Sequence, residues 1–206
     1  MRAWRLFFIV LFLLSCVSFT KIRVDDWGNL SRLHRTRLEE VIHRLELIIN
    51  SKQFEEMILR HNSNGELSFE ESNGKTNYQI YNTIMLGQEV IGSDIDLEWD
   101  ISFHSSYFVL NPTTIAYVTN TSNTINYNAA FINQDDSQHA KVICHEYVHL
   151  LGFNHYSYPK IDHIYTAPYA IGDICQYLYS SYFLSEKRED MNEECNFWCI
   201  LKRALQ

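Results

Sequence analysis

The chain has 206 residues, of which 46% are hydrophobic and 14% aromatic, and its formal net charge at pH 7 is −8. This length and composition suffice for one sizeable hydrophobic core and exclude an intrinsically disordered chain. The acidic balance disfavours nucleic acid as a partner, because a phosphate-binding surface needs clustered Lys and Arg side chains.

The first residues have the pattern of an export signal. A short basic head precedes an apolar run over residues 6–14, which is too short for a permanent transmembrane helix and lacks the polar face of a helix packed on a core. Two cleavage routes remain open. The stretch ending at Cys16 is similar to a bacterial lipobox, which would leave a lipid anchor on that cysteine, whereas cleavage after Ser18 would release the protein. We therefore assign residues 1–18 to the signal and residues 19–206 to one exported domain.

The next segment has helical periodicity. Between residues 29 and 61, apolar residues recur at three- and four-residue spacing from Leu30 to Ile49, which predicts a long amphipathic helix on the scaffold. Ser51 is a candidate cap of a second, short helix. Thr76 is a candidate cap of a third helix, which we expect to stop at Gly87.

Strand patterns follow. Residues 94–103 alternate polar and apolar with period two, which predicts a strand with one buried face. Residues 114–119 and 124–128 have strand composition, and the segment between them has turn composition, so we expect a hairpin. Residues 135–137 provide charge and a cap for a helix over residues 138–151. Beyond a loop that ends at Pro168, we expect two further helices over residues 171–183 and 186–205.

The helix predicted over residues 138–151 contains a pattern suited to metal binding. His145 and His149 are four residues apart, so their imidazoles lie on one helical face and can converge on one ion, and neutral imidazole suits zinc. Glu146 can reach a water on such an ion rather than the ion itself. The other six histidines receive no such role, since a lone histidine is more often a satisfied surface or core residue.

Gly152 and His155 complete the pattern. A glycine three residues after His149 can adopt the left-handed conformation that ends a helix, and the resulting turn lets His155 return as a third ligand. Three protein ligands leave the fourth position of zinc for water, which distinguishes a catalytic site from a structural one.

Four cysteines remain if Cys16 is lipidated or removed. Cys144, Cys175, Cys195 and Cys199 form an even set in an oxidising compartment, where disulfides persist, but four cysteines allow three complete pairings and the sequence does not choose among them. Because no CxxC pair is present, a cysteine-ligated zinc site is disfavoured. Cys144 lies away from the ligand face of its helix, which favours packing or a disulfide.

The motif resembles the signature HExxHxxGxxH of the metzincin peptidases, which include the matrixins and astacins. His145, Glu146, His149, Gly152 and His155 occupy all five specified positions, and such a set arises by chance in about one chain in 10^5 of this length. The resemblance implies one catalytic zinc ion and a twisted sheet. It also implies that an edge strand formed by Ile115, Ala116, Tyr117 and Val118 binds an extended peptide substrate through its backbone.

The sequence departs from the family at the methionine-containing turn beneath the zinc. No methionine lies between His155 and Met191, and Ile171 stands about where that methionine is expected, in a turn leading into a helix. The resemblance also offers Tyr169 as a contact to the metal or to the substrate oxyanion, against ordinary packing. We expect the segment of residues 156–169 to set substrate specificity.

These observations together predict an α+β fold. We expect a mixed, twisted sheet with the long N-terminal helix and the helix of the HExxH motif on one face, an upper part over residues 29–152, and a smaller helical lower part over residues 153–206. The predicted function is an exported zinc endopeptidase with Glu146 as the general base. The alternatives are a zinc protein that binds peptides without cutting them and an envelope surface protein. Apart from a possible lipid anchor, no membrane contact is expected.

Overall fold

The computed structural model describes residues 19–63, 65–92, 95–119, 121–155 and 164–184. The predicted signal with Cys16, most of the predicted specificity segment, and the predicted helix over residues 186–205 with Cys195 and Cys199 lie outside this part. Within the described residues, none of the helices combines the length and the apolar character that crossing a membrane would require.

The fold is α+β, with a mixed four-stranded sheet in the order β1-β2-β4-β3. β1 (Lys21–Asp26), β2 (Glu98–Ser106) and β4 (Ser122–Asn128) run parallel, while β3 (Ala116–Thr119) pairs with β4 in the antiparallel sense and forms one edge. The hairpin predicted from the sequence is therefore confirmed. The strand predicted over residues 94–103 begins later, at Glu98, because Leu97 adopts a φ of 65° and interrupts the extended backbone.

β1 was not predicted. Its six residues are mostly charged and mostly exposed, and polar and apolar residues alternate only from Lys21 to Val24, which is too short a pattern to indicate a half-buried strand. The strand is held instead by its parallel partner β2 and by Arg23, whose guanidinium forms ion pairs with Glu98 and Asp100 of that strand. Pairing between segments so distant along the chain cannot be seen in a local pattern.

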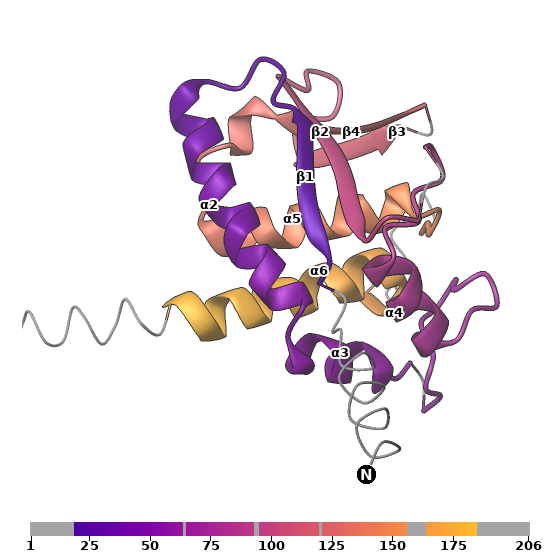
Figure 1. Ribbon diagram of the computed structural model, residues 1–206. Coiled ribbons are helices and arrows are strands. Elements are labelled where there is room, and N and C mark those ends of the chain that lie inside the picture. Colours follow the sequence, from indigo (N-terminus) through magenta and orange to yellow (C-terminus); the bar gives the residue numbers. More distant parts are fainter. Residues whose placement is uncertain (1–18, 64, 93–94, 120, 156–163, 185–206) are drawn as a thin grey trace, which may run out of the picture.

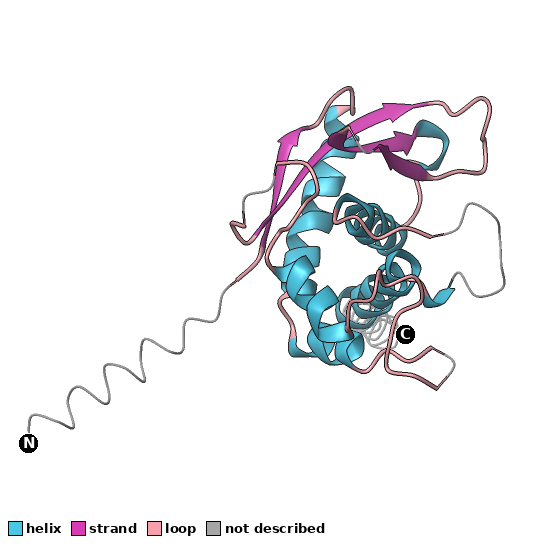
Figure 2. Cartoon of the chain, turned by 90° about the vertical axis from the view of Figure 1, so that its right-hand side faces the viewer, coloured by secondary structure: helices cyan, strands magenta, loops and turns pink. Residues whose placement is uncertain are grey.

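The helices lie beneath one face of the sheet (Figure 2). α2 (Arg32–Ile49) crosses the sheet, capped by Ser31, and buries Leu38, Val41, Leu45 and Ile48. It starts three residues later than expected, and Leu33 of the predicted apolar stripe is exposed. The short helix α3 (Lys52–Leu59) is capped by Ser51 as predicted.

α4 (Asn77–Met85) confirms the predicted cap at Thr76, which forms a capping box with Gln79. The chain then turns at Gly87, where φ is 60° and an added Cβ would meet the Glu98 backbone oxygen, so only glycine fits. A short 3-10 turn, η1 (Ala129–Phe131), leads from the sheet to the next helix.

α5 (Asp136–Leu150) and α6 (Ala167–Tyr179) pack against each other below the sheet, and α6 continues into η3 (Ser180–Leu184) (Figure 1). A disulfide between Cys144 of α5 and Cys175 of α6 joins them. This selects one of the pairings that the sequence left open. The sheet, α5 and α6 thus form successive layers, and the two helices are covalently connected.

Candidate metal centre and cleft

α5 holds the first part of the site. The carboxylate of Asp135 accepts a hydrogen bond from the Gln138 amide and caps the helix, as the sequence predicted. The face opposite the histidines is buried, and it consists of the residues predicted to cluster there, Ala140, Ile143, Tyr147, Leu150 and Leu151. The helix is therefore fixed in the core on one side and presents His145, Glu146 and His149 on the other.

Gly152 turns the chain at the end of α5. Its φ is +85°, its amide donates to the His149 carbonyl over 2.9 Å, and the amide of Phe153 donates to the Val148 carbonyl over 3.3 Å. This pair of hydrogen bonds is the Schellman arrangement, which needs a left-handed residue after the helix. The turn brings the ring of His155 to a centroid distance of 4.8 Å from His149 and 5.4 Å from His145. Gly152 thus occupies the conformation that the sequence predicted.

The three histidines form a compact cluster. One ring nitrogen from each of His145, His149 and His155 lies within 4.8 Å of the others, close enough for a single ion to contact all three. The Nδ1–H of His149 donates to the Phe153 carbonyl over 2.7 Å, which leaves Nε2 as the ligand atom. The backbone of Pro168, whose only hydrogen-bonding group is a carbonyl, is bonded to His145 in the same way.

The protonation state of these rings suits a metal. Burial lowers the pKa of His145 to about 3 and that of His149 to about 4, so both imidazoles are neutral at pH 7. Neutral imidazole is the form that coordinates a metal, and the fixed tautomer removes the cost of reorienting the ring. The donor set therefore fits a zinc ion with one open position.

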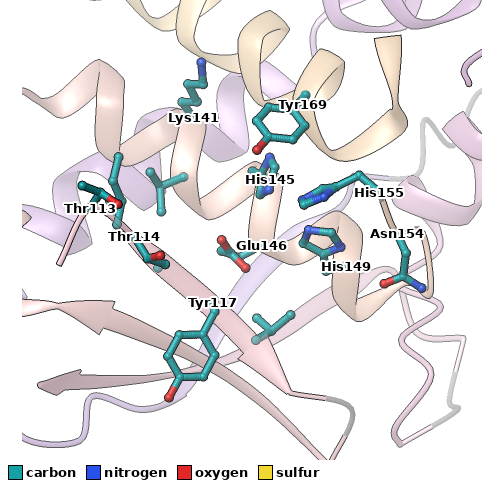
Figure 3. Close-up of a pocket in the computed structure, with 14 residues that line it drawn as sticks. Thr113, Thr114, Tyr117, Lys141, His145, Glu146, His149, Asn154, His155 and Tyr169 are labelled. Carbon is teal, nitrogen blue, oxygen red and sulfur yellow. The ribbon is translucent and has the colours of Figure 1, made fainter. Parts of the chain in front are cut away.

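Glu146 lies beside the cluster with only 6% of its surface exposed. Burial raises the pKa of its carboxyl to about 8, and a hydrogen bond from the Val118 backbone acts in the opposite direction. Val118 belongs to β3, so the carboxyl group lies between the helix of the histidines and the edge of the sheet (Figure 3).

A cleft of about 600 Å³ runs over these residues. One wall is the β3 edge and the segment before it, including all four residues predicted as a substrate edge, Ile115, Ala116, Tyr117 and Val118. Within the described part of the chain, no strand pairs with the outer side of β3. The cleft therefore combines an open strand edge with the histidine cluster.

Tyr169 of α6 lies on the far side of the cluster from β3 (Figure 3). Its ring centroid is 4.5 Å from His145 and 4.9 Å from His155, and the side chain lines the cleft. The sequence had offered this tyrosine as a site residue against ordinary packing, and the structure brings it to the site.

Ile171 lies within a helix and not in the turn that the sequence predicts. The segment expected to be a turn is helical from Ala167 onward, and Ile171 is fully buried in α6 and does not line the cleft. The close approach to the site comes from the next residue, Gly172, where an added Cβ would lie 3.3 Å from the Cβ of His145 and 3.1 Å from the Lys141 carbonyl oxygen. A glycine therefore lets α6 pack directly under the first histidine.

Sequence reasoning missed several residues of the cleft. Lys141 precedes His145 by one helical turn, so the same helical spacing that identified the histidines could have placed it on this face. Asn154, which is hydrogen bonded to His149, could have been inferred from its place inside the turn. Thr113 and Thr114 come from the loop before β3, and no local signal indicates them.

A second group of potential ligands, Asp96, Glu98 and Asp100, lies at the β1–β2 side of the sheet. Arg23 already forms ion pairs with Glu98 at 2.9 Å and with Asp100 at 2.9 Å. The Arg23 guanidinium thus already occupies two of these three carboxylates, so the histidine cluster is the better candidate metal centre.

Comparison of this chain with models of known protein families, with curated proteins and with solved structures finds no match. We therefore infer the function of the protein from the chemistry of the cleft.

Proposed function

We propose that the protein is a zinc-dependent endopeptidase of metzincin type, exported from the cell that makes it. The observation that carries the proposal is the juxtaposition of a three-histidine cluster, a buried glutamate and an unpaired strand edge in one cleft. A binding site for metal alone has no need of Glu146, and a binding site for peptide alone has no need of the histidines. Hydrolysis of a bound peptide needs all three parts.

His145, His149 and His155 would hold the zinc ion, which when bound supplies a Lewis acid and lowers the pKa of water. The carbonyls of Phe153 and Pro168 keep the rings oriented. Glu146 accepts the proton of the attacking water and returns it to the leaving amine. Burial alone raises the pKa of this carboxyl to about 8, and a cation held by the three histidines would lower that pKa, so that the carboxylate is available as the base.

The remaining residues position the substrate. The edge formed by Ile115, Ala116, Tyr117 and Val118 would pair with an extended peptide through the backbone groups that bond neither β4 nor Glu146, which is sequence-tolerant recognition. The hydroxyl of Tyr169 is directed toward the cleft beside His145 (Figure 3), where it can donate a hydrogen bond to the carbonyl oxygen as negative charge develops.

The test compares zinc content and cleavage of an unfolded protein by the wild type, Glu146→Gln and Glu89→Gln. Glu89 is a matched control, because it is a buried glutamate outside the cleft that accepts hydrogen bonds which the Gln oxygen retains. We expect stoichiometric zinc in all three proteins. Cleavage should fall at least about a hundredfold for Glu146→Gln alone.

Two results would contradict the proposal. Full zinc occupancy with equal background cleavage by all three proteins would favour the zinc-containing peptide-binding module. Absence of bound metal in the wild type would remove both functions and favour an envelope surface protein.

A further inference from the structure

Lys75 lies far from the histidines in the sequence, at the end of the loop between α3 and α4. Its ammonium lies 5.2 Å from the centroid of the Phe153 ring and donates to the Thr83 hydroxyl oxygen over 3.2 Å. Within the described part of the chain, this ammonium forms no ion pair. The contacts of the cation are therefore an aromatic ring on the turn after α5 and a hydroxyl group on α4.

Phe153 connects this contact to two of the three histidines. Its ring is only 1% exposed, and its carbonyl accepts the hydrogen bond that orients the His149 ring. The next residue, Asn154, is also hydrogen bonded to His149, and the chain then reaches His155. A displacement of Phe153 would therefore move the acceptor that orients one ligand and the backbone that carries another.

The ammonium of Lys75 is held from both sides. Thr83 is buried in α4, and its hydroxyl donates to the Gln79 carbonyl over 2.8 Å, so its oxygen is free to accept from the ammonium. A cation within about 6 Å of a ring centroid is attracted by the negative face of the ring. Lys75 thus attaches the turn after α5 to α4.

The same loop makes a second contact with this turn. The side-chain amide of Asn73 donates to the Gly152 carbonyl over 3.4 Å. Between these two residues, a Cβ added at Gly74 would meet nothing within 4 Å. The loop therefore reaches the turn through the side chains of Asn73 and Lys75 and not through the backbone at Gly74.

We propose that Lys75 is a positioning residue of the metal centre, which holds Phe153 so that His149 and His155 face the ion. Lys75 does not line the cleft, so it acts on the ligands through Phe153 and does not touch the substrate. This role rests on the proposed function, because it concerns the zinc ligands.

The test measures zinc affinity by competition with a chelating dye and records the visible absorption of the Co²⁺-loaded protein, which reports ligand geometry. Lys75→Met keeps most of the apolar stem and removes the cation. We expect its zinc affinity to fall at least about threefold and its Co²⁺ spectrum to change. Lys75→Arg should restore most of both properties, because a guanidinium keeps the charge and stacks on aromatic rings.

Lys52→Met is the matched control. Lys52 is an exposed lysine on α3 that pairs with Glu55, and its replacement should change neither zinc affinity nor the Co²⁺ spectrum. Thr83→Val is a second, independent variant, which removes the acceptor of the ammonium and keeps the side-chain shape. It should change both properties in the same direction as Lys75→Met.

Unchanged zinc affinity and an unchanged Co²⁺ spectrum in Lys75→Met and Thr83→Val would overturn the role of Lys75, even if both proteins melted at a lower temperature. Equal losses in Lys75→Met and Lys75→Arg would also overturn it, because the charge would then not matter. These measurements need bound metal but no cleavage. A wild type that binds zinc and cuts no peptide would therefore overturn the peptidase proposal alone.

Discussion

At the scale of single residues, the histidines divide into two kinds according to what faces them. His145 and His149 each have one nitrogen bonded to a backbone carbonyl and the other facing the cleft, which is the arrangement of a metal ligand. His139, six residues before His145 on the same helix, is fully buried instead, with its Nδ1 2.6 Å from the hydroxyl oxygen of Tyr127. The helical face decides which histidine reaches the cleft.

The burial of His139 predicts that acid destabilises the protein. Burial and the charge of Arg37 lower the pKa of His139 from 6.5 to about 4 in the folded state. The unfolded chain binds this proton more readily, so the contribution to stability is complete above pH 6.5 and is lost as the pH falls toward 4. At pH 4 the loss is about 3 kcal/mol from this residue.

The measurement is the free energy of unfolding of the metal-free protein in denaturant at pH 7 and pH 4. His139→Asn serves as the comparison, because its amide can still bond Tyr127 but does not titrate. We expect the variant to be less stable at pH 7 and to lose clearly less stability on acidification. Equal losses in the two proteins would show that other groups account for the acid sensitivity.

At the scale of secondary-structure elements, the turn that ends α5 is as important for the histidine cluster as the helix face that carries His145 and His149. Gly152→Ala forces a side chain into a left-handed conformation, which costs about 1–2 kcal/mol, and brings its Cβ to 3.0 Å from Val90. Since this turn positions His155, zinc affinity should fall at least about tenfold by competition with a chelating dye. Gly74→Ala has a similar φ of +75° and nothing within 4 Å, so it should lose stability and keep its zinc affinity.

If both glycine variants retained wild-type zinc affinity, the turn would not be what positions the third histidine. If both lost it equally, the loss would reflect general destabilisation rather than the geometry of α5.

The disulfide between α5 and α6 is the second structural feature at the scale of secondary-structure elements. Cys144 and Cys175 are 31 residues apart and connect α5 to α6, which carries Tyr169 and Gly172. Closing a loop of this length stabilises the folded state by about 4 kcal/mol in the chain-entropy description. Cys144→Ala with Cys175→Ala should therefore lower the midpoint of thermal unfolding markedly, and a reductant should lower that of the wild type. Equal sensitivity of both proteins to the reductant would contradict this role.

The elements also show what sequence patterns can and cannot predict. The caps at Ser51, Thr76 and Asp135 were predicted because capping depends on residues a few positions apart. β1 was missed because its only strong partner is a strand more than 70 residues later in the chain. The sequence predicts the start of α6 too late, because Pro168 is compatible with the end of a loop as well as with the first turn of a helix, where proline is favoured.

At the scale of the whole molecule, the site also contains residues that a local sequence pattern predicts and residues that only tertiary packing brings together. The five residues of the motif lie within eleven consecutive positions, so their spacing alone predicted a cluster that the structure brings together. Tyr169, Gly172 and the loop before β3 reach the cleft only through the packing of α6 on α5 and of the sheet above them. These residues become part of the cleft only through tertiary packing, which a local pattern does not reveal. The sequence proposes one of them, Tyr169, and it does so by family resemblance.

This layered arrangement predicts that zinc stabilises the whole fold rather than a local loop. The ion would join α5 to the turn after it, and α5 is joined to the sheet by Tyr127 and His139 and to α6 by the disulfide. With free zinc about a thousandfold above its dissociation constant, the gain is about 4 kcal/mol, measured as a higher melting temperature than in chelated protein. His155→Ala should lose this gain. Asp96→Asn, in the acidic cluster around Arg23, should keep it, because we propose the three histidines as the metal centre. A gain that survives His155→Ala and disappears with Asp96→Asn would place the stabilising metal at the sheet instead.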